Sequence, residues 1–327
     1  MNAKRRTLAV LAAVIAVLGL ALWALNRSTA AEEAASSAAA DGTIPLCSFS
    51  TADLSRITYT YNGQTLTLDD ADGSWTLADD PDYHLDASAC NTMVTALASL
   101  NAKRQLTAQP GEDYGLADPA VTVTVTAAGE TNTFAFGTEN PVTGDLYVQK
   151  AGDDAVYTVS GNKAACFELT KADIFGTFNP AELTVSALES VSITTGSGTL
   201  ALNAVSEPAE AESDSSESAA DSTTYQTVWR LAEEPSADLD DSKVQSILSA
   251  LAGYVTAQIT DADPSAYGFA APLATVRAAS ADGTVTIHYA ENADGCWMMV
   301  EGDSSVYAVD LDTVQALLIT AAALKAE

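Results

Sequence analysis

Histidine and basic residues are scarce in this chain of 327 residues. It contains two histidines, and only 14 lysines and arginines against 44 aspartates and glutamates, which gives a formal net charge of −30. A surface this acidic repels nucleic-acid phosphates and anionic lipid headgroups, so we expect neither as a partner. No spacing brings His84 or His288 together with a carboxylate, as a metal site requires, so we place both histidines on the surface.

Recognised catalytic motifs are also missing. No G-x-S-x-G turn is available to present a nucleophilic serine. Ser160 and Lys163 fit S-x-x-K, but the S-D-N and K-T-G strings that accompany this motif in penicillin-binding enzymes do not occur. The acidic segments 69–73 and 291–295 resemble calcium loops, but strands are expected on both sides of each, so we interpret them as hairpin turns. We therefore expect no catalytic residue, metal or cofactor, and a protein that is not an enzyme.

The cysteines show no C-x-x-C spacing for metal or redox chemistry. An exported protein can form disulfides, and four cysteines allow three pairings. A chain of this length does not need disulfides to fold, and two of the cysteines lie on the apolar stripes of expected helices. We therefore favour free thiols packed in the core. The four residues are Cys47, Cys90, Cys166 and Cys296.

A long apolar run near the N-terminus is the first positive feature. It begins at Leu8 and ends at Leu25, holds no charged residue, and as a helix would span roughly 27 Å, close to the hydrocarbon thickness of a bilayer. Because three basic residues precede it, we expect residues 1–27 to form a single-pass cell-membrane anchor with a cytoplasmic N-terminus and the bulk of the chain outside. The alternative is a signal peptide cleaved near Ala30, which leaves a secreted protein.

Alternating residues predict strands after the anchor. Residues 28–50 are small, polar and non-periodic, so we interpret them as a flexible linker. The strands "RITYTY" and "QTLTL" follow, joined by Asn62-Gly63, a strong hairpin turn, and "DGSWTL" gives a third strand. An amphipathic helix begins after Asp86, its expected N-cap, and four more strands and a short helix from Asn162 complete the series.

The same series is then written a second time. "YGLADP" returns as "YGFAAP", and "GDDAVYTV" returns as "GDSSVYAV". The offset between corresponding residues falls gradually from 154 to 150, which we attribute to small turn deletions, and the copy ends in one terminal helix. We expect the repeated positions to serve packing and turns. They are Tyr114, Gly115, Pro119, Tyr267, Gly268, Pro272, Trp75 and Trp229.

These patterns predict an α+β fold of two tandem homologous units after an N-terminal transmembrane helix. Each unit is expected to be an antiparallel sheet of hairpins packed with one or two helices. The first unit spans residues 51–176 and the second 177–327. A stretch with six acids and no base at 206–224 predicts a disordered insertion in the second unit.

Several of these segments together resemble prokaryotic domain-of-unknown-function family 4340. They are "DLSRITYTYNGQTLTL", "DGSWTL", "YGLADPAVTVTV", "LYVQ" and "VYTV". The resemblance covers residues 51–327 as two copies, and Y-G-L-x-D-P before an alternating strand is its most specific part. In the second copy Ala271 stands in place of the aspartate. The resemblance implies a membrane-anchored, extracytoplasmic auxiliary component of an ABC-type export system, and it supplies no catalytic residues.

Three functions remain open from the sequence. The leading hypothesis is a membrane-anchored extracytoplasmic accessory or binding protein, whose partners are ABC transporter subunits or other envelope proteins. The second is a solute- or polymer-binding envelope protein with a groove between the repeats. The third is an envelope hydrolase that uses a carboxylate pair.

Overall fold

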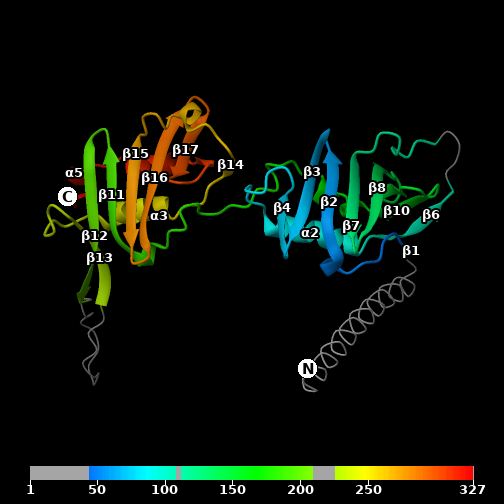
Figure 1. The fold of residues 1–327 in the computed structure, drawn as a ribbon, viewed down its shortest axis with the longest axis horizontal. Helices are drawn as coiled ribbons and strands as arrows, with labels where there is room; N and C mark the ends of the chain where they lie inside the picture. Colours follow the sequence, from blue (N-terminus) through cyan, green and yellow to red (C-terminus); the bar gives the residue numbers. More distant parts are fainter. Residues whose placement is uncertain (1–43, 108–111, 209–224, 327) are drawn as a thin grey trace, which may run out of the picture. The chain divides into compact units, whose positions relative to one another are not determined.

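The computed structural model of the chain describes residues 44–107, 112–208 and 225–326, and it is drawn in Figure 1. Its contacts divide the chain between Gly176 and Thr177. The expected anchor, with its alternative cleavage point at Ala30, and most of the expected linker lie outside the described residues. Among the described helices, none is long and apolar enough to cross a bilayer.

The last part of the expected linker belongs to the first unit, which corrects the sequence prediction. Strand β1 (Ile44–Pro45) pairs with β5 (Asn101–Ala102), and the backbone N–H of Leu46 donates to the carbonyl of Leu100 at 3.0 Å. Leu46 and Cys47 are buried in the core of this unit. Two apolar side chains in a polar stretch are too short a signal to predict a strand from its own periodicity.

The described strands of the first unit also form an eight-stranded antiparallel sheet in the order β4-β3-β2-β7-β8-β9-β10-β6. This confirms the expected hairpins, and Asn62 and Gly63 turn with φ of 48° and 74°. Strand β6, at the edge beside β10, was not predicted. The strands are β2 (Leu54–Tyr61), β3 (Gln64–Ala71), β4 (Ser74–Leu77), β6 (Arg104–Leu106), β7 (Val121–Ala127), β8 (Glu130–Glu139), β9 (Asp145–Lys150) and β10 (Val156–Ser160).

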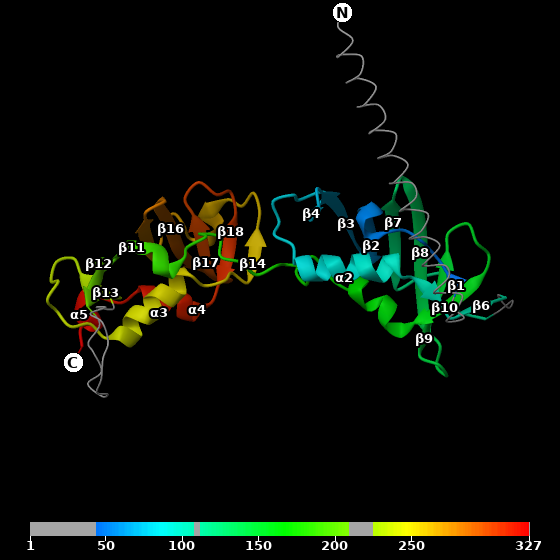
Figure 2. The same ribbon diagram turned by 90° about the horizontal axis from the view of Figure 1, so that it is seen from below.

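One face of this sheet packs against helix α2 (Ala87–Ala98), as Figure 2 shows. Asp86 caps the helix as expected, because its Oδ1 accepts the backbone N–H of Ser88 at 2.8 Å. The apolar stripe of α2 is buried toward the sheet. The short helix expected from Asn162 is instead two 3₁₀ turns, η2 (Gly161–Lys163) and η3 (Ala165–Phe167). The two buried residues of this segment, Ala164 and Phe167, suffice to hold so short a stretch against the core.

The opposite face of the first sheet carries rows of threonine. Thr58 pairs across the strands with Thr67 on one side and Thr124 on the other. The Thr58 and Thr67 hydroxyls lie 3.1 Å apart, and a further pair on this face joins the hydroxyls of Thr126 and Thr131 at 3.2 Å. Cross-strand threonine pairs of this kind stabilise a half-solvated sheet.

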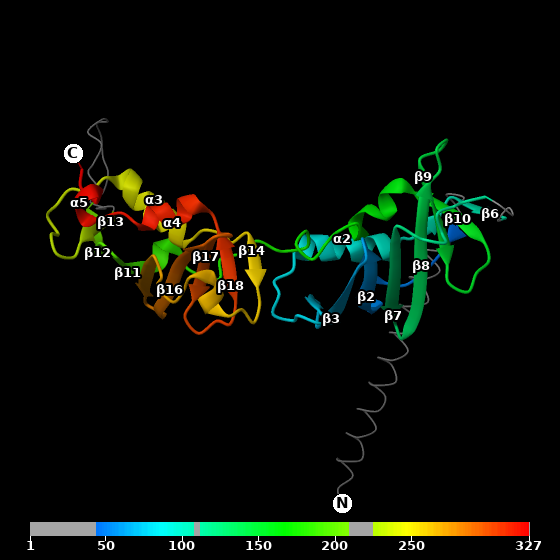
Figure 3. The same ribbon diagram turned by 90° about the horizontal axis from the view of Figure 1, so that it is seen from above.

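The second unit repeats this architecture in the order β13-β12-β11-β15-β16-β17-β18-β14. Helices α3 (Asp241–Leu251) and α4 (Leu311–Leu317) lie side by side on one face of the sheet (Figure 3). The strands are β11 (Leu188–Thr195), β12 (Gly198–Pro208), β13 (Tyr225–Leu231), β14 (Ala257–Ile259), β15 (Ala274–Ser280), β16 (Gly283–Asn292), β17 (Gly295–Val300) and β18 (Val306–Val309).

Two predictions for the second unit were wrong. The single terminal helix is divided into α4 and α5 (Ala321–Leu324), because Thr320 caps a new helix with its hydroxyl 3.3 Å from the Ala323 N–H. The acidic insertion begins later than expected, since Ser206 and Pro208 belong to β12 and pair with residues of β13. Residues 209–224 of the expected insertion lie outside the described part of the chain.

Strand register corrects the expected gradual drift between the copies. Val148 pairs with Phe136 in the first sheet, and Met298 pairs with Tyr289 in the second. The offset is therefore 153 in β8 and β16 but 150 in β9 and β17. The three-residue difference lies in one connection. The β8–β9 ladder shifts register between Phe136 and Glu139, whereas β16 and β17 pair without a shift up to a two-residue turn.

Acid is expected to destabilise the first unit partly through Asp145. The Lys103 Nζ donates to Asp145 Oδ1 at 2.5 Å and thereby lowers the pKa of this nearly buried carboxyl. A carboxyl whose pKa is lower in the folded state stabilises the fold above its unfolded pKa of about 3.9 and loses that contribution as pH falls further. Urea unfolding at pH 7 and pH 3 tests this, because Asp145→Asn should narrow the stability difference between the two conditions. An unchanged difference would contradict it.

Candidate functional site

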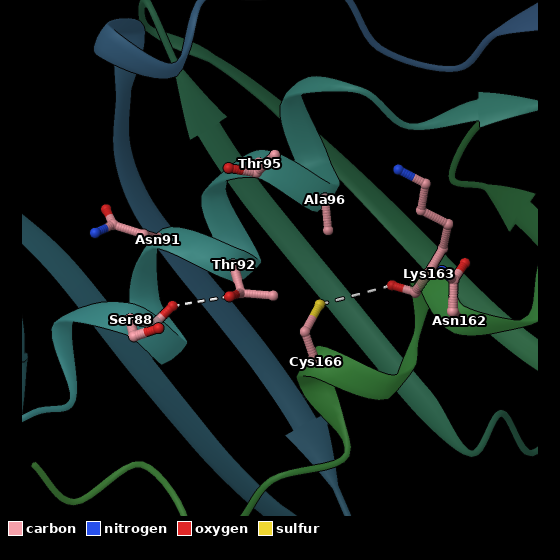
Figure 4. A pocket seen from close by; sticks show the side chains of 8 residues that line it. All are labelled: Ser88, Asn91, Thr92, Thr95, Ala96, Asn162, Lys163 and Cys166. Carbon is pink, nitrogen blue, oxygen red and sulfur yellow. Dashed lines mark hydrogen bonds between the residues drawn. The ribbon is translucent and has the colours of Figure 1, made fainter.

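A groove of about 600 Å³ runs along α2 in the first unit, with η2 and η3 as its opposite wall (Figure 4). The two walls are about 70 residues apart in the sequence. Most side chains along the groove are short and carry a hydroxyl or amide. The lining residues are Ser88, Asn91, Thr92, Thr95, Ala96, Asn162, Lys163 and Cys166.

The helix wall follows from the amphipathic pattern of α2. Met93 and Leu97 are fully buried toward the sheet. The polar side chains on the other side of the amphipathic helix therefore point away from the sheet. Thr92 and Thr95 are exposed there, and the Thr92 hydroxyl donates to the Ser88 carbonyl at 2.8 Å (Figure 4). The wall therefore presents hydroxyl oxygens that remain able to accept hydrogen bonds.

The opposite wall is fixed by the buried Phe167. Its ring meets that of Tyr59 edge-on at 5.9 Å, and the Tyr59 hydroxyl donates to the Leu169 carbonyl at 3.1 Å. This contact holds η3 against the sheet, so that Lys163 and Cys166 face the groove. The Lys163 Nζ donates to the Ser99 Oγ at 3.0 Å, which links this wall to the end of α2.

The chemistry of the groove is hydrogen bonding with one cation. Burial raises the pKa of the Cys166 thiol to about 11, and its Sγ lies 3.7 Å from the Lys163 carbonyl oxygen. The thiol is therefore protonated near neutral pH, whereas nucleophilic attack requires the thiolate. Ser160 does not line the groove, so the S-x-x-K residues are not brought together there as a serine nucleophile and its base.

The second unit has a groove of about 540 Å³ at the corresponding place, between α3 and α4. Six lining positions of the two grooves correspond through the repeat offsets, whereas Ser88 and Asn91 line only the first groove and Gln315 only the second. On the helix wall, Thr92, Thr95 and Ala96 correspond to Ser246, Ser249 and Ala250. On the other wall, Asn162, Lys163 and Cys166 correspond to Asp312, Thr313 and Ala316. The three corresponding helix positions keep their chemistry in both copies, whereas the charged residue of the other wall changes from a lysine to an aspartate.

The repeated phrase lies outside both grooves, in the segment that leads into β7 or β15. The Tyr114 ring meets that of Tyr147 edge-on at 4.9 Å, and Tyr267 meets Trp297 at 4.7 Å. Gly115 and Gly268 follow these tyrosines with φ of 69° and 89°, where a glycine is favoured.

The prolines and tryptophans of the repeat also occupy matching places. Pro119 and Pro272 each lie two residues before the first residue of β7 and β15. Trp75 lies opposite Asp70, and Trp229 lies opposite Ala204, which are corresponding register positions. Trp229 is buried and Trp75 is half-buried against the core.

The remaining candidates form no second site. All four cysteines are free thiols, with Cys47 and Cys90 buried. His84 is exposed, and the Nδ1 of His288 lies 3.1 Å from the Thr275 hydroxyl. No cluster of three or more histidine, cysteine, aspartate or glutamate side chains suited to a metal is found in the described ranges. The grooves were missed because sequence patterns marked the buried faces, although a comparison of the polar positions of the two helices would have indicated them.

The protein therefore belongs to the α+β class and consists of two tandem units, one with a groove beside α2 and the other with a groove between α3 and α4. Residues 75–228 and 229–327 each match the family model described as Domain of unknown function (DUF4340). The chain belongs to this family, in two tandem segments. The segments begin at Trp75 and Trp229, the corresponding residues of the repeat, so each starts on the third strand of a unit. No curated protein and no solved structure matches the chain.

Proposed function

We propose that this chain is a membrane-anchored, extracytoplasmic binding protein that serves an ABC-type export system and holds segments of its partners in the two grooves. The observation that carries the proposal is the groove itself, which is built twice with small or hydroxyl-bearing side chains at three corresponding positions of its helix wall. The apolar run near the N-terminus and the family resemblance support the location and the kind of partner.

Exposed positions elsewhere in the copies are partly retained and partly changed. On the open sheet face, the hydroxyl pair of Thr60 and Thr65 is kept as Thr194 and Thr199. In contrast, Thr67 corresponds to Ala201 and Thr124 to Arg277. Serine and threonine also form helices less well than alanine, by about 0.5 kcal/mol for each residue. Helix stability therefore does not explain why hydroxyls occupy the same exposed positions of α2 and α3. In both helices one such hydroxyl donates to the carbonyl four residues earlier, from Thr92 to Ser88 and from Ser246 to Ser242, and a ligand in contact with these oxygens is the role that we propose for them.

The groove chemistry supports binding over catalysis. The thiol of Cys166 is protonated near neutral pH, and a glycosidase needs two carboxylates across one cleft. The first groove is lined by no carboxylate among the described residues, and the second by Asp312 alone. Hydroxyl and amide groups beside a floor of small side chains suit the main chain of a peptide segment, which offers donors and acceptors at close approach.

Site-specific photo-crosslinking in native cells tests the proposed function. A benzophenone amino acid at Asn91 places the reactive group in the first groove, whereas the same amino acid at Thr131 places it on the open sheet face of that unit. Both side chains are exposed, so the two variants are matched. We expect a crosslink to an ABC transporter subunit from position 91 and not from position 131. Equal labelling from both positions, or none from position 91, would contradict the proposal.

A further inference from the structure

We infer that the two grooves select segments of opposite charge, so that the chain joins two chemically different partner segments rather than two copies of one. This inference rests on the proposed binding function and concerns the same sites. The first groove is assigned a peptide segment that carries carboxylates. The second is assigned a peptide segment that carries lysine or arginine.

Lys163 sets the preference of the first groove. It is the one charged side chain among the eight that line the groove. One hydrogen of its ammonium group is used by the Ser99 hydroxyl, which leaves two donors for a ligand. A carboxylate placed between Lys163 and the amide of Asn162 would receive charge-assisted hydrogen bonds. The other described residues that line the groove are uncharged, so no carboxylate within the lining competes for the lysine.

Asp312 sets the opposite preference in the second groove. It is the one charged side chain among the seven that line this groove, and it is exposed in the first turn of α4. Thr313 stands where the first groove has its lysine. The net charge of −30 also steers cations toward the chain, which favours a basic segment here. In the first groove the same field opposes an acidic ligand, so its binding depends on Lys163.

The helix wall and the opposite wall of each groove contribute differently to the choice of ligand. The three corresponding helix positions give both grooves short side chains against which a main chain can lie. The change from Asn162 and Lys163 to Asp312 and Thr313 alters the groove charge from +1 to −1. An acidic segment is therefore repelled by the second groove as well as attracted by the first, and discrimination requires both effects.

Two benzophenone-bearing peptides of twelve or so residues provide the probe. They share an alanine, serine and asparagine sequence and differ in carrying either three glutamates or three lysines. After photolysis with the full chain, mass spectrometry locates the crosslinks. We expect the acidic peptide to label the α2 groove, and the basic peptide to label the α3 groove, each with a preference of about fivefold. The preference should weaken as salt rises.

Exchanging the two charge sets within the chain provides the matched control. Asn162→Asp with Lys163→Thr should turn the first groove toward the basic peptide, and Asp312→Asn with Thr313→Lys should turn the second toward the acidic one. Each exchange changes the charge of the whole chain by only two, so general attraction of the basic peptide stays nearly constant. The inference is overturned if both peptides label each groove equally, if neither labels a groove, or if the exchanges leave the preferences unchanged.

The two proposals fail in different ways. Crosslinks to a transporter subunit from position 91, together with peptides that are not distinguished, would remove the charge preference and keep the accessory function. Peptides that are distinguished, together with no transporter crosslink, would remove the export role and keep the charge preference.

Discussion

Gly137→Ala is expected to lower the free energy of unfolding of the first unit by about 3 kcal/mol. A Cβ at position 137 would lie 2.1 Å from the carbonyl oxygen of Tyr114. That oxygen accepts the Thr138 N–H at 2.9 Å, and the Tyr114 ring packs on Tyr147. The segment that leads into β7 therefore has to move away from β8 and give up both contacts to accommodate one methyl group.

The second unit supplies the control for this substitution. Ala290 lies at the position that corresponds to Gly137, and the structure accommodates its methyl group in the interior. Ala290→Gly should cost only about 1 kcal/mol, through lost burial and greater backbone freedom. Hydrogen exchange of the intact chain, followed in β8 and β16 separately, measures both effects. Normal protection of β8 in Gly137→Ala would show that the segment moves freely and that the close approach is unimportant.

Tyr289→Phe is expected to raise the free energy of unfolding of the second unit by about 1–3 kcal/mol. The Tyr289 hydroxyl is buried in the core and has no hydrogen-bond partner among the described residues. Burial also raises the pKa of this phenol, so that it remains neutral at any ordinary pH. The tyrosine hydroxyl loses its hydrogen bonds to water on folding and gains none, whereas phenylalanine avoids this cost and keeps the ring packing. Phe136 occupies the corresponding position in the first unit.

Two further substitutions serve as controls for the expected gain in the free energy of unfolding. Phe136→Tyr places the hydroxyl in the first core and should destabilise that unit by a similar amount. Tyr59→Phe removes a hydroxyl that does have a partner, the Leu169 carbonyl at 3.1 Å, and should cost about 1 kcal/mol. Denaturant unfolding with hydrogen exchange in β16 and β2 reports each change. A loss of stability in Tyr289→Phe would mean that its hydroxyl is bonded in solution.

Local patterns predict much of the fold. The hairpin at Asn62-Gly63 follows from turn residues between alternating strands, and the structure confirms it. Asp86 caps α2, as the sequence indicates. The duplication identifies corresponding residues even where individual letters differ. In each case the signal lies within about a dozen residues, which is the range over which sequence periodicity is informative.

Features that depend on distant residues could not be predicted in this way. Strands β6 and β14 are three residues long and exist because β10 and β18 offer an edge to pair with. The groove walls depend on Phe167 meeting Tyr59, more than 100 residues away in the sequence. The division of the terminal helix depends on the cap at Thr320, which a continuous apolar pattern conceals.

The register shift in the β8–β9 ladder bears on how two similar sheets in one chain avoid misassembly. Tandem copies are prone to strand exchange during folding, when a strand of one copy pairs inside the other. From Phe136 to Glu139, β8 advances three residues against the two of β9, whereas β16 and β17 advance one for one throughout. If β8 paired with β17 in that uninterrupted register, its residues beyond Phe136 would turn to the opposite face of the sheet, so the correct partner is favoured.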